Sequence, residues 1–321
     1  MNGYRILGIA FISFAIISCG KNDLSQDNLG TGEEGKNGTS PGPAPENKVP
    51  ELSIWHWGSE RRPYGINNVI MDDARMRETI DSYIQNKVTR VYGGYSKIPA
   101  HPIQKENLAK WNRKLKQLGI KSIYLIGNEQ WIYPENRQMM IDYILEYYVK
   151  FNLSVDVDAK LQGLHLDLEP HQLKEWSAAS IHRKRELLYL LKDTYRDLRL
   201  TLLHYGMEKD EIMADIPTWF DEMSAIGWAS EIEKYNWFND TMNYINGFTI
   251  MAYELASIPT IVQRTNWERN NFKANIQIGL DADEIGRIWN SKSAIINALR
   301  EINVQTQAPI AVHNYTTFME Q

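Results

Sequence analysis

Three ionisable residues alternate along one short apolar segment of the chain. His165, Asp167 and Glu169 take every second position between Gly163 and Pro170, and leucines fill the positions between them. Successive side chains of a β-strand point to opposite faces, so the leucines share one face and the ionisable groups share the other. Three such groups are costly to bury unless they bond to one another or reach a cavity. The pattern predicts either a buried polar network or a site at a strand end, where Pro170 places Glu169.

The two carboxyl groups of this segment suit the cleavage of glycosidic bonds. That reaction needs one carboxylic acid that stays protonated near neutral pH and a second group that stabilises an oxocarbenium-like centre. We expect Glu169 to be the acid, because the like charge of Asp167 favours its protonated form. If two carboxylates act across the sugar ring, the partner would be Asp281 or Glu254. A separation of about 5 Å would then predict retention of configuration, and about 6.5 to 9.5 Å inversion.

The elements that position these residues follow a repeating order of strand and helix, which is typical of parallel strands joined by helices. Eight strands are expected, at residues 52–57, 87–92, 121–126, 163–167, 212–216, 247–251, 276–280 and 310–313. Helices are expected at residues 72–86, 104–118, 134–151, 180–200, 221–238 and 282–302. Eight units predict an α/β fold, the (β/α)8 TIM barrel, with a short or missing last helix. An open doubly wound sheet is the rival, but the chain lacks its Gly-rich first turn.

The same alternation selects further candidates at the strand ends, where barrel enzymes keep their sites. In the first strand it directs Trp55 and Trp57 toward the barrel axis and His56 toward the helices. The other residues expected to contact a ligand, beside His165, are Asp215, Trp219, Glu254, Asp281, His313 and Tyr315, and Tyr253 is expected to point toward the barrel axis. Simpler roles remain open for some. His313 could be a core histidine, Trp219 could roof the barrel, and Asp283 and Glu284 are better read as helix caps.

The first fifty residues predict export and a lipid anchor. Arg5 precedes an uncharged run from Ile6 to Ser18, which is long enough for a signal peptide but shorter than a membrane span. The run ends Ile-Ile-Ser-Cys-Gly and resembles the bacterial lipobox, which implies a signal peptide at residues 1–18 and lipidation, including palmitate, at Cys19. Residues 19–50 have almost no large apolar side chain and are expected to be a flexible linker. A buried helix with an incidental cysteine does not fit that composition.

Composition limits the remaining classes of protein. Cys19 is the only cysteine, so the chain cannot form an internal disulfide, and about 270 further residues suit one domain at 51–321. A net charge of −5 without a basic block argues against nucleic acid as a partner. The 10 Trp and 17 Tyr include more aromatic faces than most cores use, and such faces stack on sugar rings. We expect a monomer without a cofactor or bound metal, which contacts the membrane through its lipid only.

Two motifs resemble those of chitinase-type glycoside hydrolases of family 18. The run Gln162-Gly-Leu-His-Leu-Asp-Leu-Glu169 is similar to their fourth-strand signature, which ends in Asp-x-Glu, and Met251-Ala-Tyr-Glu254 is similar to the Met-x-Tyr-Asp of their sixth strand. The resemblance implies a TIM barrel in which Glu169 is the general acid. It implies that Asp167 orients and stabilises an N-acetyl group of the substrate, and that Tyr253 hydrogen-bonds the reacting centre.

The sequence departs from that family at three places. Gln162 and His165 replace its first two acids, His313 and its neighbours replace its eighth-strand tryptophan, and Glu254 replaces the shorter aspartate. Two other functions therefore stay open. One is a glycan-binding barrel that has lost catalysis. The other is a metal-dependent hydrolase with His165, Asp167, Asp215 and His313 as ligands, although no tight ligand pair is present. With the anchor, we expect a glycan-acting protein of the bacterial cell envelope, on the outer membrane.

Overall fold

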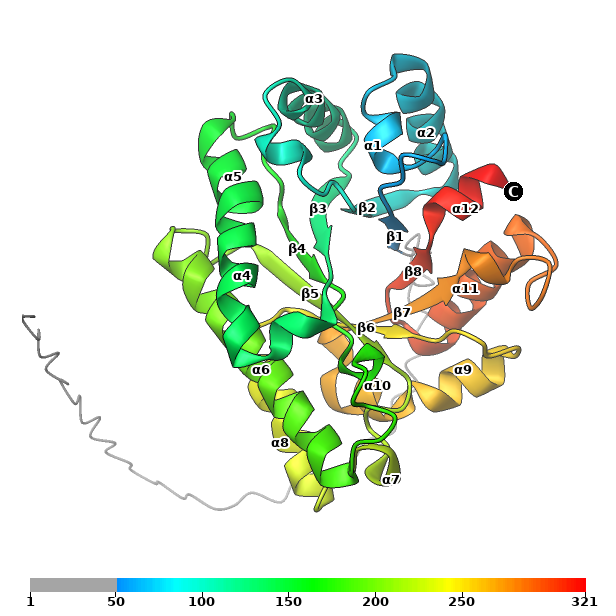
Figure 1. Cartoon of the computed structure of the whole chain (residues 1–321). Helices are drawn as coiled ribbons and strands as arrows, with labels where there is room; N and C mark the ends of the chain where they lie inside the picture. Colours follow the sequence, from blue (N-terminus) through cyan, green and yellow to red (C-terminus); the bar gives the residue numbers. More distant parts are fainter. Residues whose placement is uncertain (1–50) are drawn as a thin grey trace, which may run out of the picture. The chain divides into compact units, whose positions relative to one another are not determined.

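Eight parallel strands close into a barrel surrounded by helices (Figure 1). The computed structural model describes residues 51–321, so the expected signal peptide, Cys19 and the linker lie outside the described residues. The strands are β1 (Leu52–His56), β2 (Val88–Gly93), β3 (Lys121–Ile126), β4 (Gly163–Leu166), β5 (Glu211–Pro217), β6 (Gly247–Met251), β7 (Ile276–Asp281) and β8 (Ile310–His313). Each expected strand is present, with ends within one residue of those expected for all eight.

The barrel is closed by pairing between its first and last strands. Leu52, Ser53 and Ile54 of β1 pair in parallel with Ile310, Ala311 and Val312 of β8. An open sheet would leave these two strands apart. The predicted (β/α)8 TIM barrel is therefore confirmed and the doubly wound alternative is wrong.

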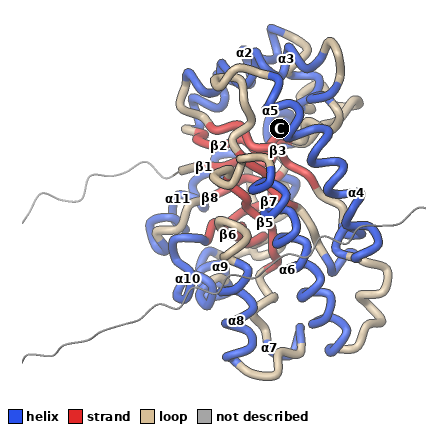
Figure 2. The backbone as a smooth tube through the Cα atoms, turned by 90° about the vertical axis from the view of Figure 1, so that its left-hand side faces the viewer, coloured by secondary structure: helices blue, strands red, loops and turns tan. Residues whose placement is uncertain are grey.

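Helices cover the outside of the strands (Figure 2). They are α1 (Ile66–Val69), α2 (Asp73–Asn86), α3 (Gln104–Gln117), α4 (Pro134–Ile144), α5 (Lys150–Ser154), α6 (Ile181–His204), α7 (Met223–Ile226), α8 (Glu231–Thr241), α9 (Ile258–Arg264), α10 (Asn266–Phe272), α11 (Lys292–Thr306) and α12 (Tyr315–Glu320). A π-helical turn, Leu145–Val149, joins α4 to α5. Within residues 51–321, no helix combines the length and apolarity that crossing a membrane requires.

Two expected helices are divided by residues that favour helix ends. The helix expected at 221–238 becomes α7 and α8, because Gly227 has a φ of 73° and ends α7, and Ser230 caps α8. The helix expected at 282–302 begins only at Lys292, where the Ser291 side chain accepts a hydrogen bond from the Ala294 N–H. Before it lie a short 3₁₀ turn and Gly286, which has a φ of 88°.

The side chains of the strands form two separate apolar clusters. The larger lies between the strands and the helices and includes Leu164, Leu166 and Leu168 of the alternating segment. The smaller fills the barrel interior and comprises Trp55, Tyr92, Ile123, Leu125 and Ala311, with Trp57 packed against it. Gly279 makes room for the large indole there, since a Cβ at this position would lie 2.9 Å from the Trp55 ring.

The alternation of β1 continues as expected at His56. Its ring is fully buried among the helices, where Nδ1 lies 2.5 Å from the Tyr83 hydroxyl and Nε2 lies 2.6 Å from the Tyr64 carbonyl. Burial lowers the pKa of His56 to about 4, so the ring is neutral in the folded protein.

The expected direction of Tyr315 is wrong. Its ring packs in the helix layer against His56, Tyr83 and Phe318, and its hydroxyl lies 2.7 Å from the Ser82 hydroxyl. The preceding Asn314 has a φ of 51° and caps α12, so the strand alternation stops at His313. Tyr315 therefore cannot contact a ligand at the barrel mouth.

A buried carboxyl group among the outer helices makes folding sensitive to pH. Glu268 of α10 is fully buried, neither carboxyl oxygen has a hydrogen-bond partner among the described residues, and burial with the charge of Asp221 raises its pKa to about 8. Such a group favours the folded state below its unfolded pKa of 4.5, and this contribution is lost as the pH rises through 8.

We predict that Glu268→Gln removes much of the loss of stability between pH 5 and pH 9. The difference should be on the order of 2 to 4 kcal/mol, since each pKa unit corresponds to about 1.4 kcal/mol. Urea unfolding at both pH values measures it, with the exposed Glu106→Gln as a control. An equal pH dependence in the wild type and Glu268→Gln would contradict the prediction.

Candidate active site

A cavity of about 740 Å³ opens at the carboxyl ends of strands β4 to β8. Its volume is within the range of ordinary ligand sites. Acidic and aromatic side chains dominate the lining, which includes Asp167, Glu169, His171, Gln172, Asp215, Trp219, Tyr253, Glu254, Asp281, Glu284, Arg287 and His313. The structure thus brings together eight of the twelve residues predicted for catalysis or ligand contact.

The segment after β4 places two carboxyl groups on the cavity. Asp167 is partly buried, and its Oδ1 is buried without a hydrogen-bond partner among the described residues. Glu169 reaches the mouth, where its side chain is 14% exposed. The Glu169 Oε2 lies 2.9 Å from His171 Nε2, and Oε1 accepts a hydrogen bond from the Gln172 amide. The alternation therefore places two carboxyl groups on one cavity, with Asp167 deeper along the segment and Glu169 at the mouth.

Trp55, His165 and Asp215 form a hydrogen-bonded group below the cavity. His165 Nε2 lies 2.7 Å from Asp215 Oδ1, and Trp55 Nε1 lies 3.2 Å from Asp215 Oδ2 and 3.1 Å from His165 Nε2. Trp55 and His165 are at most 1% exposed, and neither lines the cavity. Direct ligand contact by these two residues, as predicted from the sequence, is therefore wrong; they support the residues that line the cavity.

A second group of the same composition lies nearer the mouth. Trp57 Nε1 donates to His313 Nε2 at 3.1 Å, and His313 Nδ1 lies 3.0 Å from Asp281 Oδ1. Since Nε2 accepts the indole proton, the proton of a neutral His313 lies on Nδ1 and points to Asp281. The Tyr253 ring lies against His313, with ring centroids 5.3 Å apart. This group fixes the orientation of the Trp57 indole.

Burial controls the ionisation of the inner groups. It raises the pKa of Asp167 well above its usual range, and the charges of Asp215 and Glu169 raise it further. Burial also raises the pKa of Asp215, while the Trp55 hydrogen bond acts in the opposite direction. The Tyr253 hydroxyl has no partner, and burial among four carboxyl groups raises its pKa as well. Tyr253 is therefore a neutral donor available to a ligand.

Two residues of the rim are less enclosed than the inner group. Trp219 packs its ring against His171, Trp176 and Phe220 at the wall of the cavity. Glu254 has a φ of 60°, and its side chain is 79% exposed with one oxygen 3.7 Å from Arg287. The longer Glu254 side chain thus turns toward solvent.

Sequence reasoning missed several parts of this site. His171 and Gln172, which contact Glu169, lie just after the alternating segment, and Pro170 was a signal for the turn that brings them back. Glu284 was expected to cap a helix. Instead it is 2% exposed and accepts hydrogen bonds from the Glu254 N–H and the Trp289 indole, while Asp281 caps the 3₁₀ turn.

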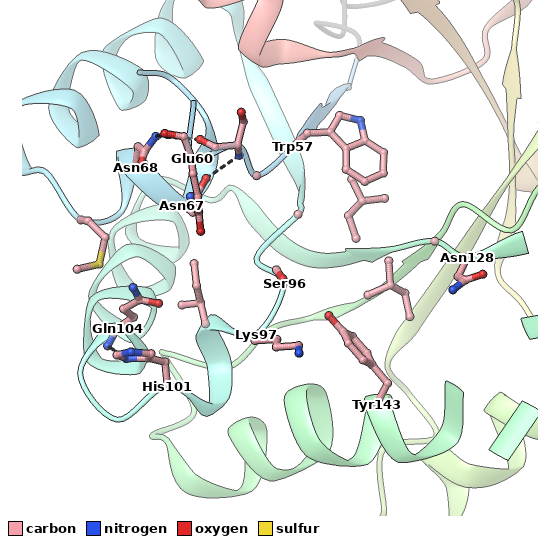
Figure 3. A pocket seen from close by; sticks show the side chains of 18 of the residues that line it. Trp57, Glu60, Asn67, Asn68, Ser96, Lys97, His101, Gln104, Asn128 and Tyr143 are labelled. Carbon is pink, nitrogen blue, oxygen red and sulfur yellow. Dashed lines mark hydrogen bonds between the residues drawn. The ribbon is translucent and has the colours of Figure 1, made fainter. Parts of the chain in front are cut away.

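A second cavity, of about 850 Å³, opens after strands β1, β2 and β3 (Figure 3). The sequence did not predict it. Trp57, Trp131 and Tyr143 supply aromatic faces, and Asn67, Ser96, Lys97, Gln104 and Asn128 are among its polar lining residues. Trp57 lines this cavity and bonds to His313, which lines the first. The two cavities therefore adjoin at Trp57.

The metal-ligand set considered from the sequence is not assembled. Within residues 51–321, the groups close enough to share an ion are Asp281, Asp283 and His313, whose ligand atoms lie within 4.8 Å of one another. Hydrogen bonds already use these atoms, since Asp283 accepts from Asn314 and Thr317 and Asp281 pairs with His313. His165 and Asp215 bond to each other and do not form such a group with Asp167 and His313. The four ligands of the alternative metal site are therefore not brought together.

Comparisons with known proteins show the fold. No model of a protein family matches the chain, and no curated protein matches it by sequence. A family 18 (GH18) chitinase from Pseudoalteromonas aurantia superposes with a TM-score of 0.52 at 11% identity, over 83% of this chain and 94% of that one. A chitinase from Bacteroides thetaiotaomicron gives 0.53 at 13% identity, over 84% and 90% of the two chains.

A third solved structure of similar fold is a β-glucuronidase. The β-glucuronidase 2 of Bacteroides uniformis, covalently bound to an aziridine, gives a TM-score of 0.54 at 10% identity. The match covers 83% of this chain and 30% of that one. The chain thus has the fold of family 18 chitinases and related glycoside hydrolases and diverges from them widely in sequence. A shared barrel fold does not by itself identify a substrate.

Proposed function

We propose that this protein is a glycoside hydrolase, with Glu169 as the general acid. The observation that carries the proposal is the pairing of two carboxyl groups on the wall of one cavity: Asp167, whose Oδ1 is buried and unpartnered, and Glu169, which reaches the mouth. Proton donation to a glycosidic oxygen requires an acid that a substrate can reach, and Glu169 meets that requirement. Similarity in fold to chitinases and a β-glucuronidase supports the same class of reaction.

The other lining residues have distinct parts in this proposal. Glu169 donates its proton to the leaving oxygen, while Asp167 orients and stabilises a polar substituent of the sugar. The free Tyr253 hydroxyl donates to the reacting group. Trp219 offers an aromatic wall for a sugar ring. Because the chain is similar in fold to family 18 chitinases, an N-acetylated sugar is the first candidate substrate.

A glycan-binding protein without catalysis is the second candidate. One observation favours it specifically: both oxygens of Glu169 are engaged, by His171 and by Gln172. An acid held in this way donates a proton only if a substrate displaces one of these contacts. The replacement of the family's first two acids by Gln162 and His165 points the same way.

The substitution Glu169→Gln tests the catalytic role. We expect a loss of roughly 10²- to 10⁴-fold in kcat, the usual contribution of a general acid, with binding retained. The measurement uses a panel of fluorogenic glycosides for kcat and calorimetry for binding, with Glu106→Gln as a matched surface control.

Two results would decide against catalysis by Glu169. Full activity of Glu169→Gln would exclude it as the acid. If the wild type cleaves no glycoside in the panel but binds a saccharide, and Glu169→Gln binds it equally well, the non-catalytic function is correct.

We also propose that the second cavity holds further sugars of the same glycan. Its aromatic faces and amide groups suit a saccharide, and it adjoins the first cavity at Trp57. The Lys97 amine forms no ion pair or hydrogen bond with any described residue, so it is available to a ligand.

This extension predicts a dependence on ligand length. In the Glu169→Gln background, Lys97→Ala should weaken binding of a long oligosaccharide about fivefold, equivalent to about 1 kcal/mol for one hydrogen bond. Binding of the shortest saccharide that fills the first cavity should not change. Calorimetry on both lengths measures this, with Lys105→Ala as control. Equal losses for both lengths would contradict the extension.

The place of action remains a proposal drawn from the sequence. We propose lipidation at Cys19 and attachment to the outer membrane of a bacterial cell envelope, with an extracytoplasmic glycan as the substrate. The apolar run before Cys19 and the polar stretch after it support this.

The substitution Cys19→Ser should move the protein from the membrane fraction to the soluble fraction. It should also abolish incorporation of labelled palmitate, because the acylated thiol is lost. Ser18→Ala, which keeps a small residue before the cysteine, should remain lipidated. Palmitate incorporation into Cys19→Ser would contradict the assignment.

A further inference from the structure

Asp167 and Asp215 are two buried carboxyl groups without a cation. Asp215 is 2% exposed, and Asp167 has a buried oxygen without a partner. Among the ion pairs of residues 51–321, none joins a lysine or arginine to either group. Two nearby carboxyl groups with no balancing positive charge cannot both ionise at neutral pH. One of them therefore keeps a proton.

The hydrogen bonds distinguish the two groups. Asp215 has the Trp55 indole N–H at 3.2 Å from one oxygen and His165 Nε2 at 2.7 Å from the other. With the His165 proton on Nε2, that nitrogen cannot accept from the Trp55 N–H, which lies 3.1 Å from it. The indole then donates to Asp215, and both contacts are donations to an ionised carboxylate. That tautomer also leaves His165 Nδ1 without a proton, which agrees with its lack of a partner in the structure.

Asp167 lacks equivalent donors. Its Oδ1 is buried and unpartnered, and an ionised carboxylate with such an oxygen would lose the full cost of desolvation. Burial, Asp215 and Glu169 all raise the pKa of Asp167. Burial and Glu169 also raise the pKa of Asp215, but there the Trp55 hydrogen bond and His313 act in the opposite direction.

We propose that Asp215, held by Trp55 and His165, is the ionised carboxylate below the cavity, and that its charge keeps Asp167 protonated. Asp215 is thus a positioning residue that acts through Asp167. It supplies from β5 a buried negative charge that β4 cannot supply, because position 165 holds a histidine.

Other titratable groups surround Asp167 and Asp215 and affect which of the two is ionised. They are His165 and Glu169 on the same segment as Asp167, Tyr92 on β2, Tyr195 on α6, Tyr253 just after β6, Asp281 on β7 and His313 on β8, with Arg90 and Glu211 acting on His165. Tyr195 and Tyr253 have free hydroxyls, and the pKa of each is raised, so neither supplies a competing negative charge.

The consequence for catalysis rests on the proposed function. When Glu169 gives its proton to the glycosidic oxygen and the bond to the sugar breaks, Glu169 becomes a carboxylate. The proton that stays on Asp167 forms a hydrogen bond to that new carboxylate. Water then adds to the anomeric carbon and gives its proton to Glu169, which restores the acid.

Carboxyl ¹³C NMR of the full chain, labelled at aspartate Cγ, tests the assignment. Resonances are assigned from their loss in Asp167→Asn and in Asp215→Asn. The Asp215 resonance should be at the ionised position at neutral pH and should titrate at a lower pH than the Asp167 resonance. In Asp215→Asn the midpoint of Asp167 should fall by at least one pH unit. The control Asp240→Asn, which removes an exposed acid of α8, should not move it.

A second substitution covers the case in which Asp215→Asn fails to fold. Trp55→Phe removes one donor to Asp215, so the midpoint of Asp215 should rise and that of Asp167 should fall. The proposal is overturned if Asp215 has the protonated shift at neutral pH, or if the Asp167 midpoint is unchanged in every variant that folds. These spectra need no substrate, so failure of the glycosidase assignment and failure of this proposal give different results.

Discussion

Two indole N–H groups, one on β1 and one just after it, form hydrogen bonds with the ionisable residues of the barrel axis. Trp55 donates within the group that contains His165 and Asp215, and Trp57 donates to His313, which pairs with Asp281. A closed barrel offers little water to such residues, so each needs a partner from another strand. The indoles provide those partners while filling the interior with apolar surface. The cavity above them takes its shape from these contacts.

This arrangement also explains how the chain can share a fold with chitinases without sharing their inner acids. The fourth strand keeps Asp167 and Glu169 but has His165 between the axis and the neighbouring strand. A histidine there needs an acceptor, and Asp215 of β5 is 2.7 Å away. The eighth strand has His313 where the family has a tryptophan, and an indole from β1 lies against it. In this chain the partners of His165 and His313 come from other strands, within the same barrel architecture.

The strands and their inward and outward faces could be predicted because alternation with period two depends only on local backbone geometry. Prediction failed where that geometry changed. Asn314 adopts a left-handed conformation and sends Tyr315 into the helix layer, and nothing in the local sequence required it. The sequence also did not predict how deep each inward-facing residue lies along the barrel axis. Trp55 and Trp57 share a face, but only Trp57 lines a cavity, because depth depends on the stagger of neighbouring strands.

The contacts that build the site join residues far apart in the chain, which has a consequence for how the protein matures. Trp55 and Asp215 are 160 residues apart, and Trp57 and His313 are 256 apart. Contacts of such long range form late in folding, because closing the intervening loops costs entropy. The second of them crosses the seam where β1 meets β8. A partly folded chain would therefore have neither oriented tryptophan, and the site would appear only in the step that closes the barrel.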